Sequence, residues 1–381
     1  MKILLIGEYS RLHNSLKEGL EILGHDVQII GTRDGFKNLP VDVDVQSRYF
    51  ITGFGLLVKR IVAKISNIDL QGVERGIRFY LAIKRGGHAD VVQLINEESI
   101  KAGVKFEIFL IKEILKRTKK LFLLSSGTDY VSVAFAHDKK FKYSLLTPYF
   151  NGDAKNDKTY AFVLKFITPP FIKLHNFLYK NCNGVIATDF DYHIPLIGNP
   201  KYLGIIPNPI NLDLIPFNKI KISGGIKIFH GINTGNFYKK GNYIFEKALE
   251  IIKKKYPDKV EVFVVTNVPY EEYIKLYEDA HIIMDQVFAY DQGYNALESM
   301  ARGKVVFTGA EEEFLDYYKL KKNEVCVNAL PDIDEIVKEL EYLIENPTEI
   351  VKTGFNARKF VEKHHDYVAI AEKYLTTWRL N

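Results

Sequence analysis

The chain has 381 residues, of which 47% are hydrophobic and 26% are charged. This length exceeds what one ordinary hydrophobic core serves, so it predicts two domains, and the composition excludes a disordered chain. The net charge of +5 is too small to indicate a nucleic-acid-binding protein. Cys182 and Cys326 lie far apart without metal-ligand spacing, so neither a disulfide framework nor a zinc site is expected.

The chain opens with a short apolar run, KILLI, directly after Met1. This run is shorter than a signal peptide requires, and no stretch approaches the roughly 18 apolar residues of a membrane span. We therefore expect a cytoplasmic protein that is at most peripheral at the inner membrane face.

In the first half, short apolar runs alternate with amphipathic stretches, which is typical of a parallel sheet covered by helices. The predicted strands are residues 2–6, 26–30, 90–94, 121–125, 184–188 and 202–206. The predicted helices are residues 12–23, 99–116 and 170–181. The pattern predicts a doubly wound α/β domain over residues 1–210.

A turn-rich segment at 205–217 contains three prolines and is expected to link two domains, because proline is poor in helices and central strands. Strands are then predicted at 226–230, 260–266, 280–285, 305–308 and 325–328, and helices at 241–255, 270–278, 292–301, 332–345, 348–363 and 366–379. A second doubly wound domain is expected over 215–365. The two rows of strand ends would face a central cleft, where ligands of open α/β sheets bind.

The loop after the first strand contains Gly7, Glu8 and His13. It lies at a strand-to-helix turn, where backbone amides can face a ligand. It lacks the G-x-G-x-x-G fingerprint of dinucleotide sites, so an ordinary surface turn is an equal alternative. His13 is a candidate ligand contact, although a lone histidine is more often structural.

A second loop, at Gly127, Thr128 and Asp129, follows the strand at 121–125. Gly127 permits a tight turn. Asp129 either points into the cleft or caps the next helix, a frequent role of aspartate.

A third segment, HGINTGNFYKKG at 230–241, follows the first strand of the second half and opens a helix. Gly231 would let the backbone approach a phosphate, and Lys239 and Lys240 would supply positive charge. The spacing excludes a Walker loop.

The most specific segment runs from 280 to 309. A strand ends in Asp285 and Gln286, and a loop leads to Gly293 at the start of a short helix. That helix would aim the amides at its N-terminus, including those of Tyr294 and Asn295, at an anion. Glu298 on the same helix would suit paired ribose hydroxyls. The alternative is that Glu298 is only an exposed helix residue.

This segment resembles the donor motif of the GT-B glycosyltransferases, especially the retaining family four, which reads E-G-F-G-x-x-x-x-E-A-M-A-x-G-x-P-V. The matching residues are Gly293, Glu298, Met300, Ala301, Gly303, Val305 and Val306. The similarity continues in PNPINLD at 207–213, KG at 240–241 and LEILGHDV at 20–27. The resemblance implies two Rossmann-like domains, with a final helix at 366–381 that packs back on the first.

The resemblance also implies an enzyme that transfers a sugar, with retention, from a UDP- or GDP-sugar to a glycan or lipid-linked acceptor in surface polysaccharide or glycan synthesis. No metal and no separate cofactor are expected. Lys240 would contact the diphosphate, Glu298 would hold the ribose on its other side, and amides near Gly293 would assist. These contacts gain strength as the leaving diphosphate gains charge.

The chain departs from the family pattern at three places. The family's first Glu falls on Tyr290, and the neighbouring Asp291 is an alternative to it. The Arg before K-G is missing, so Lys239 or His230 would cover its charge. The N-terminal H-D of many members reads T-D at 128–129. The candidate catalytic residues are Asp129, Lys240, Tyr290 and Asp291.

Basic and aromatic residues interleave at 53–65, 101–120 and 160–180. Such faces suit an anionic membrane surface, but a solvated basic face over a normal core explains the same sequence and is slightly favoured. Two other functions stay open. A GT-B nucleotide-sugar epimerase would share the nucleotide site, and a non-catalytic nucleotide-sugar-binding protein would tolerate the missing Glu. A nicotinamide-dependent oxidoreductase is disfavoured, because no glycine fingerprint follows either first strand.

Overall fold

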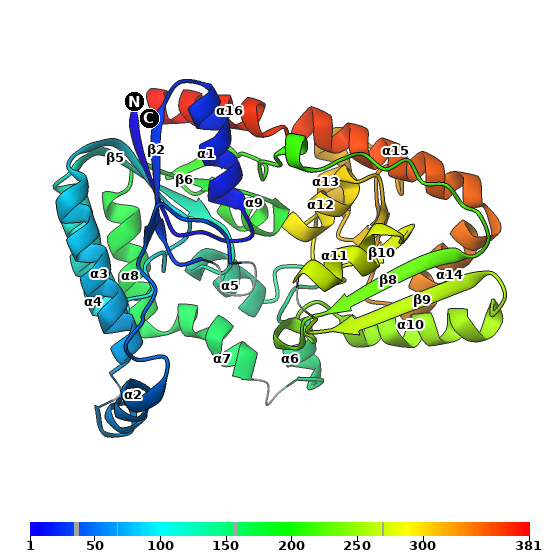
Figure 1. Ribbon diagram of the computed structural model, residues 1–381, viewed down its shortest axis with the longest axis horizontal. Coiled ribbons are helices and arrows are strands. Elements are labelled where there is room, and N and C mark those ends of the chain that lie inside the picture. Colours follow the sequence, from blue (N-terminus) through cyan, green and yellow to red (C-terminus); the bar gives the residue numbers. More distant parts are fainter. Residues whose placement is uncertain (34–37, 67, 155–157, 269) are drawn as a thin grey trace.

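A computed structural model describes residues 1–33, 38–66, 68–154, 158–268 and 270–381, which form two α/β domains side by side (Figure 1). The N-terminal sheet is parallel, with the strand order β3-β2-β1-β4-β5-β6-β7. Its strands are β1 (Lys2–Ile6), β2 (Asp26–Gly31), β3 (Val43–Asp44), β4 (Ala89–Leu94), β5 (Thr118–Ser125), β6 (Gly184–Ala187) and β7 (Tyr202–Ile205).

Helices cover both faces of this sheet, because alternate residues of its strands point to opposite sides. Leu5 packs with Leu16 in one buried cluster, and its neighbour Ile6 packs with Phe79 in another. The helices are α1 (Leu12–Ile22), α2 (Gly53–Ser66), α3 (Leu70–Gly86), α4 (Val104–Leu115), α5 (Tyr130–His137), α6 (Thr147–Asn151), α7 (Lys158–Leu164), α8 (Pro169–Asn181) and α9 (Phe190–Leu196).

The C-terminal sheet is also parallel, with the order β12-β11-β10-β8-β9. Its strands are β8 (Ile226–Ile232), β9 (Val260–Thr266), β10 (Ile282–Met284), β11 (Val305–Thr308) and β12 (Val327–Asn328). The remaining helices are α10 (Asn242–Lys255), α11 (Tyr270–Glu278), α12 (Tyr294–Ala301), α13 (Glu312–Tyr318), α14 (Ile333–Glu345), α15 (Pro347–His364) and α16 (Tyr367–Leu380).

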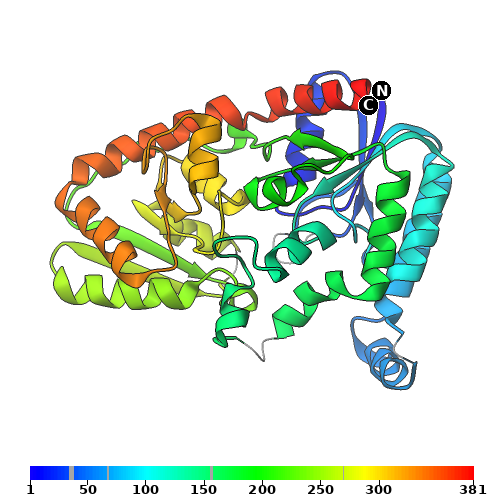
Figure 2. The same ribbon diagram turned by 180° about the vertical axis from the view of Figure 1, so that it is seen from behind.

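The last helix, α16, crosses back to the N-terminal domain and lies along α1, so both termini meet at one end of the molecule (Figures 1 and 2). Asp366 caps it by accepting hydrogen bonds from two backbone amides of its first turn. Near its end, the buried Trp378 packs on Phe122 of β5, and Lys120 donates to the Trp378 carbonyl at 2.8 Å.

The predicted α/β class with two Rossmann-like domains is confirmed. The helix predicted at 99–116 begins five residues late, at Val104, because Lys101 and Gly103 before it have positive φ (59° and 82°), which a right-handed helix excludes. The sequence did not predict β3, α2, α3, α5, α6, α7, α9 or α13. In the described part of the chain, no helix has both the length and the apolar character of a membrane span.

Candidate active site

A cavity of about 380 Å³ lies between the two domains. Its walls are loops that follow β5, β6, β8 and β10, which is the edge where open α/β sheets bind ligands. Residues that line it include Gly127, Thr128, Asp189, Asp191, Lys239, Lys240, Gln286, Asp291 and Gly293. A larger cavity of about 640 Å³ lies against α14 and α15, and none of the predicted site residues lines it. We therefore regard the interdomain cavity as the candidate site.

Lys240 enters this cavity from the loop after β8. Its Nζ donates to Asp285 Oδ1 at 2.8 Å, and the Asp285 side chain is 1% exposed. Asp285 also accepts hydrogen bonds from Asn295 and Thr308, each at 3.3 Å. The buried carboxylate therefore holds the lysine in place, while the lysine side chain remains 30% exposed.

Gly293 lines the cavity as the N-cap of α12. Gly293 has no side chain to cap the helix, so the positive end of the α12 dipole begins at a residue that lines the cavity. Gln286 also lines the cavity and donates to the Asp291 carbonyl at 3.3 Å. Two sources of positive potential, Lys240 and the start of α12, thus meet at one cavity.

Glu298 lies elsewhere. It lines a second cavity of about 140 Å³, together with Arg11 and Tyr294. The buried Tyr294 reaches across to the N-terminal domain, where its hydroxyl bonds Ser15 Oγ at 2.7 Å and donates to the Pro209 carbonyl at 2.9 Å. Lys240 and Glu298, expected on two sides of one diphosphate, thus line different cavities in this structure.

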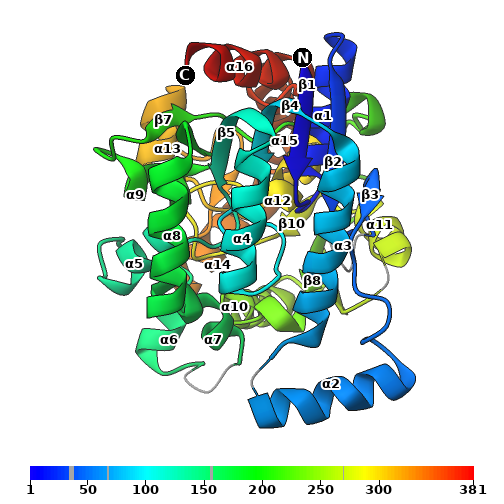
Figure 3. The ribbon, with the colours of Figure 1, turned by 90° about the vertical axis from the view of Figure 1, so that its left-hand side faces the viewer.

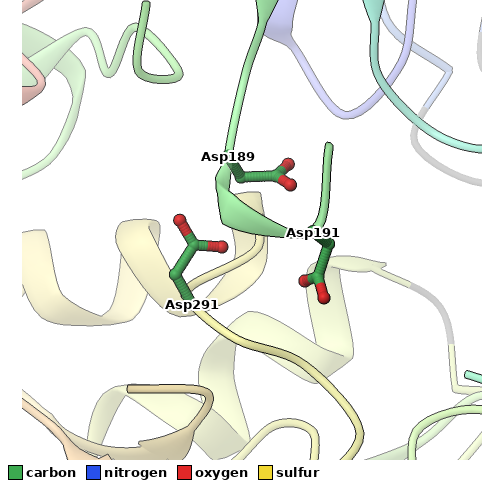
Figure 4. Close-up of side chains that lie close together, drawn as sticks. All are labelled: Asp189, Asp191 and Asp291. Carbon is green, nitrogen blue, oxygen red and sulfur yellow. The ribbon is translucent and has the colours of Figure 1, made fainter. Parts of the chain in front are cut away.

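Three carboxylates meet at the wall of the interdomain cavity (Figure 4). Asp189 and Asp191 come from the start of α9, and Asp291 comes from the loop before α12. Oxygen atoms of the three side chains lie within 4.8 Å of one another. We call these residues the carboxylate cluster. Carboxylates at such spacing are also ligands that hard divalent cations accept.

The carboxylate cluster joins the two domains by reciprocal hydrogen bonds. The Tyr290 amide of the C-terminal domain donates to Asp191 at 3.3 Å, and the Phe190 amide of the N-terminal domain donates to Asp291 at 3.1 Å. In the described residues, no hydrogen-bond partner meets Oδ1 of Asp189 or Oδ1 of Asp291.

Burial and mutual repulsion shift the titration of the cluster. Burial raises the pKa of Asp191 to about 7. Burial, and then the neighbouring negative charges, raise the pKa of Asp189 and of Asp291 well above the usual range. The cluster therefore keeps part of its protons near neutral pH.

Of the two candidates for the family's first Glu, Asp291 lines the cavity and Tyr290 does not. Tyr290 is 3% exposed, and its hydroxyl accepts a hydrogen bond from the Lys142 amide at 2.8 Å. Its ring packs against Phe141 and Tyr143 of the other domain. Tyr290 thus serves the contact between the domains.

In the N-terminal domain, Gly127 and Thr128 line the cavity, whereas Asp129 does not. Asp129 is 2% exposed and caps α5 by accepting the Ser132 amide at 2.8 Å. The Ser125 hydroxyl donates to its other oxygen. The structure therefore shows the capping alternative for Asp129.

The loop after β1 does not line the cavity. Gly7 has φ 88°, and its carbonyl bonds Nδ1 of His13 at 2.7 Å. His13 is fully buried, and burial lowers its pKa to about 4. Glu8 is 2% exposed and accepts two hydrogen bonds from Asn14. His13 thus shapes the loop from inside the core, which corresponds to the structural alternative for a lone histidine.

Two expectations for the segment after β8 also need correction. His230 is fully buried, and burial lowers its pKa to about 4, so it carries no charge near neutral pH. Gly231 lies within β8, where a Cβ would meet Tyr273 at 2.5 Å, so it serves packing rather than phosphate contact. Lys239 remains as the cation that accompanies Lys240 in the cavity.

Sequence reasoning missed Asp189 and Asp191, although they directly follow the predicted strand at 184–188. The strand-end rule that singled out residues 127–129 applies to them equally. It also missed Glu311, which accepts from Lys142 Nζ at 3.1 Å and from the Tyr143 hydroxyl across the domain interface. No local pattern marks Glu311.

Comparisons with known proteins agree with this architecture. Residues 232–376 match the family described as glycosyl transferase-like. Sucrose-phosphate synthase from Thermosynechococcus elongatus is 14% identical, with a TM-score of 0.61 over 100% of this chain and 99% of that one. HepE from Anabaena, solved in complex with UDP-glucose, is 14% identical, with a TM-score of 0.58 over 100% of both chains.

A putative UDP-N-acetylglucosamine 2-epimerase from Listeria monocytogenes is 10% identical, with a TM-score of 0.53 over 98% of this chain and 94% of that one. A search of curated proteins found no match. At these identities the solved structures establish the fold alone, and the family match covers the C-terminal domain. The chain therefore has the GT-B fold and carries a glycosyl transferase-like domain over residues 232–376.

Proposed function

We propose that the protein binds a nucleoside-diphosphate sugar in the interdomain cavity and transfers the sugar to a glycan or lipid-linked acceptor. The observation that carries this proposal is the pairing of Lys240, held by the buried Asp285, with the N-terminus of α12. A fixed cation and an uncapped helix start are groups that bind a diphosphate. HepE, which has the same fold, was solved with UDP-glucose, and this supports a UDP- or GDP-sugar as the donor.

Charge development explains how these groups would act on the reaction. As the bond between the anomeric carbon and the diphosphate breaks, the diphosphate gains negative charge. Lys240 and the amides of α12 then interact more strongly than in the ground state, which lowers the barrier. Lys239 adds a second positive charge to the same cavity.

We assign the sugar contact of the family's first Glu to Asp291, because Asp291 lines the cavity and Tyr290 does not. Its buried Oδ1 lacks a hydrogen-bond partner within the described chain and would accept a sugar hydroxyl, while its Oδ2 accepts the Phe190 amide. Gly127 and Thr128 would form the acceptor-side wall opposite. A ribose contact with Glu298 would require the nucleoside end of the donor to reach the second cavity.

The finer parts of the proposal rest on the resemblance to the retaining family. These are retention at the anomeric carbon, action in surface polysaccharide or glycan synthesis, and a cytoplasmic location at the inner membrane face. Proton NMR of the first-formed product would test retention, since the anomeric coupling constant differs between the two configurations.

A thermal-shift screen against UDP-, GDP- and other nucleotide sugars tests the donor site, because a ligand of the native state raises its stability. We expect a shift with one nucleotide class that Lys240→Ala removes. Lys227→Ala is the matched control, because Lys227 lies at the opposite end of β8 and pairs with Asp279 at 3.6 Å. No shift with any nucleotide sugar, or an undiminished shift in Lys240→Ala, would contradict the proposal.

Product analysis separates the alternatives that share this site. A transferase leaves a glycosylated acceptor and a nucleoside diphosphate, whereas an epimerase changes the sugar configuration without an acceptor. A binding protein would give the thermal shift and neither product.

A further inference from the structure

Helix α2 stands apart from the rest of the molecule, at the base of the N-terminal domain below α3 (Figures 1 and 3). None of its residues is buried. Four of its large apolar side chains are exposed to solvent: Phe54 is 81% exposed, Leu57 53%, Ile61 49% and Ile65 80%.

These four side chains share one face of the helix. At 100° per residue, positions 54, 57, 61 and 65 fall within about 80° of the helix circumference. The other side faces α3, where Lys59 Nζ donates to Gln71 Oε1 at 2.6 Å. A contiguous apolar stripe that faces water, away from the body of the protein, indicates an interaction surface.

The charged side chains of α2 are all basic. The segment from 45 to 68 contains four basic residues and no acidic residue: Arg48, Lys59, Arg60 and Lys64. By the same helical spacing, Arg60 and Lys64 lie along one flank of the stripe. The surface therefore combines apolar side chains with a charge that complements an anionic partner.

Of the three basic aromatic stretches, only the one that forms α2 leaves the apolar face of its helix exposed to solvent. The stretch at 101–120 contains α4, whose Leu110, Ile111 and Ile114 are buried against the sheet. The stretch at 160–180 contains α8, whose Leu174 and Leu178 are buried in the same way. Of the three stretches that could form a basic aromatic surface, α2 is therefore the best candidate.

We propose that α2 docks the protein on an anionic lipid bilayer. Phe54, Leu57, Ile61 and Ile65 enter the boundary between headgroups and acyl chains, and Arg60 and Lys64 face lipid phosphates. A second copy of this chain fits less well, because pairing two such helices would place their positive charges side by side. The proposal stands on α2 alone. Only the purpose of this docking, which is to bring a lipid-linked acceptor to the enzyme, rests on the proposed function.

Co-sedimentation with phosphatidylcholine vesicles, with and without phosphatidylglycerol, tests the proposal. The variant is Phe54→Ser/Ile61→Ser/Ile65→Ser. Its matched control, Ile22→Ser/Ile197→Ser/Leu380→Ser, removes apolar side chains that are 60%, 65% and 79% exposed at other sites. We expect binding to the anionic vesicles that falls about tenfold in the variant and is unchanged in the control.

Charge is tested separately with Arg60→Gln/Lys64→Gln, which should weaken binding to anionic vesicles, as should high salt, because screening weakens such contacts. Failure of the wild-type protein to bind anionic vesicles would overturn the proposal, and so would undiminished binding by the apolar variant. A wild-type dimer that becomes a monomer in that variant, without vesicle binding, would assign the surface to a second copy. The nucleotide-sugar thermal shift, measured on every variant, confirms folding and separates this outcome from failure of the donor site.

Discussion

The carboxylate cluster predicts that removing one of its charges stabilises the protein. At an effective dielectric constant of about 20, two unit charges 4.8 Å apart repel each other by about 3.5 kcal/mol. Asp291→Asn removes one such charge and keeps an oxygen that can accept the Phe190 amide. It also leaves Asp189 and Asp191 with one negative neighbour fewer.

The sign of the effect follows from the raised pKa values. Between the unfolded pKa near 4 and the raised folded pKa, which is about 7 for Asp191, the native state binds more protons than the unfolded state. Each such group therefore removes about 1.4 kcal/mol of stability per pH unit as the pH rises through this window. Asp291→Asn lacks one of these groups, so its stability relative to wild type should grow by about 1–3 kcal/mol between about pH 5 and about pH 8.

Urea unfolding of both proteins at several pH values, in the presence of a chelator, measures this difference. The stability difference between the two proteins is the right readout. Burial lowers the pKa of His13, His230 and His365 to about 4, so these histidines make both proteins less stable as the pH falls, and their effect cancels in the difference. The exposed Asp258→Asn is the control. A difference that stays flat across this range, or that favours wild type at the alkaline end, would refute the reasoning.

Three further predictions concern single residues. Lys240→Ala should lower kcat/KM for the donor by about 10²–10³ in steady-state kinetics, and it leaves the buried Asp285 carboxylate unpaired. In urea unfolding, Lys240→Ala/Asp285→Asn should therefore be more stable than Lys240→Ala, while its activity stays low. Tyr290→Phe should cost about 1 kcal/mol of stability through its lost interdomain hydrogen bond and leave kcat within about twofold, so a large loss of turnover would return the catalytic role to Tyr290. Both Gly7 and Gly24 have positive φ, but only at Gly7 would a new methyl group lie 2.3 Å from a neighbouring side chain. In thermal unfolding, Gly7→Ala should therefore destabilise the protein by about 1–3 kcal/mol more than Gly24→Ala does.

The strands of both sheets could be predicted because buried parallel strands form short, continuous apolar runs. The strand β3 escaped because two residues at a sheet edge make no such run. Residues 53–66 stood out for basic and apolar composition, yet their helix packs so little that only the structure shows which face stays open. Local pattern thus predicts the elements, and tertiary packing decides what each element covers.

The residues of the candidate site show the same difference between what local pattern predicts and what tertiary packing decides. Lys240 and Gly293 were predictable because their roles depend on backbone position at strand and helix ends. His13 and Asp129 were chosen for their chemistry, and both turned out to be buried and bonded within their own loops. Asp191 follows a predicted strand, as residues 127–129 do, but only the tertiary structure shows that it meets a carboxylate of the other domain.

Asp291 connects the proposed chemistry to the contact between the domains. Its Oδ2 accepts the Phe190 amide of the N-terminal domain, and its buried Oδ1 has no hydrogen-bond partner among the described residues. A donor sugar that reached Oδ1 would supply this missing partner and leave the interdomain hydrogen bond intact. Such a bond would favour the ionised carboxylate, whose charge opposes those of Asp189 and Asp191, so the proposed donor binding would depend on the protonation of the carboxylate cluster. One side chain would thus serve both the proposed sugar contact and the contact between the domains.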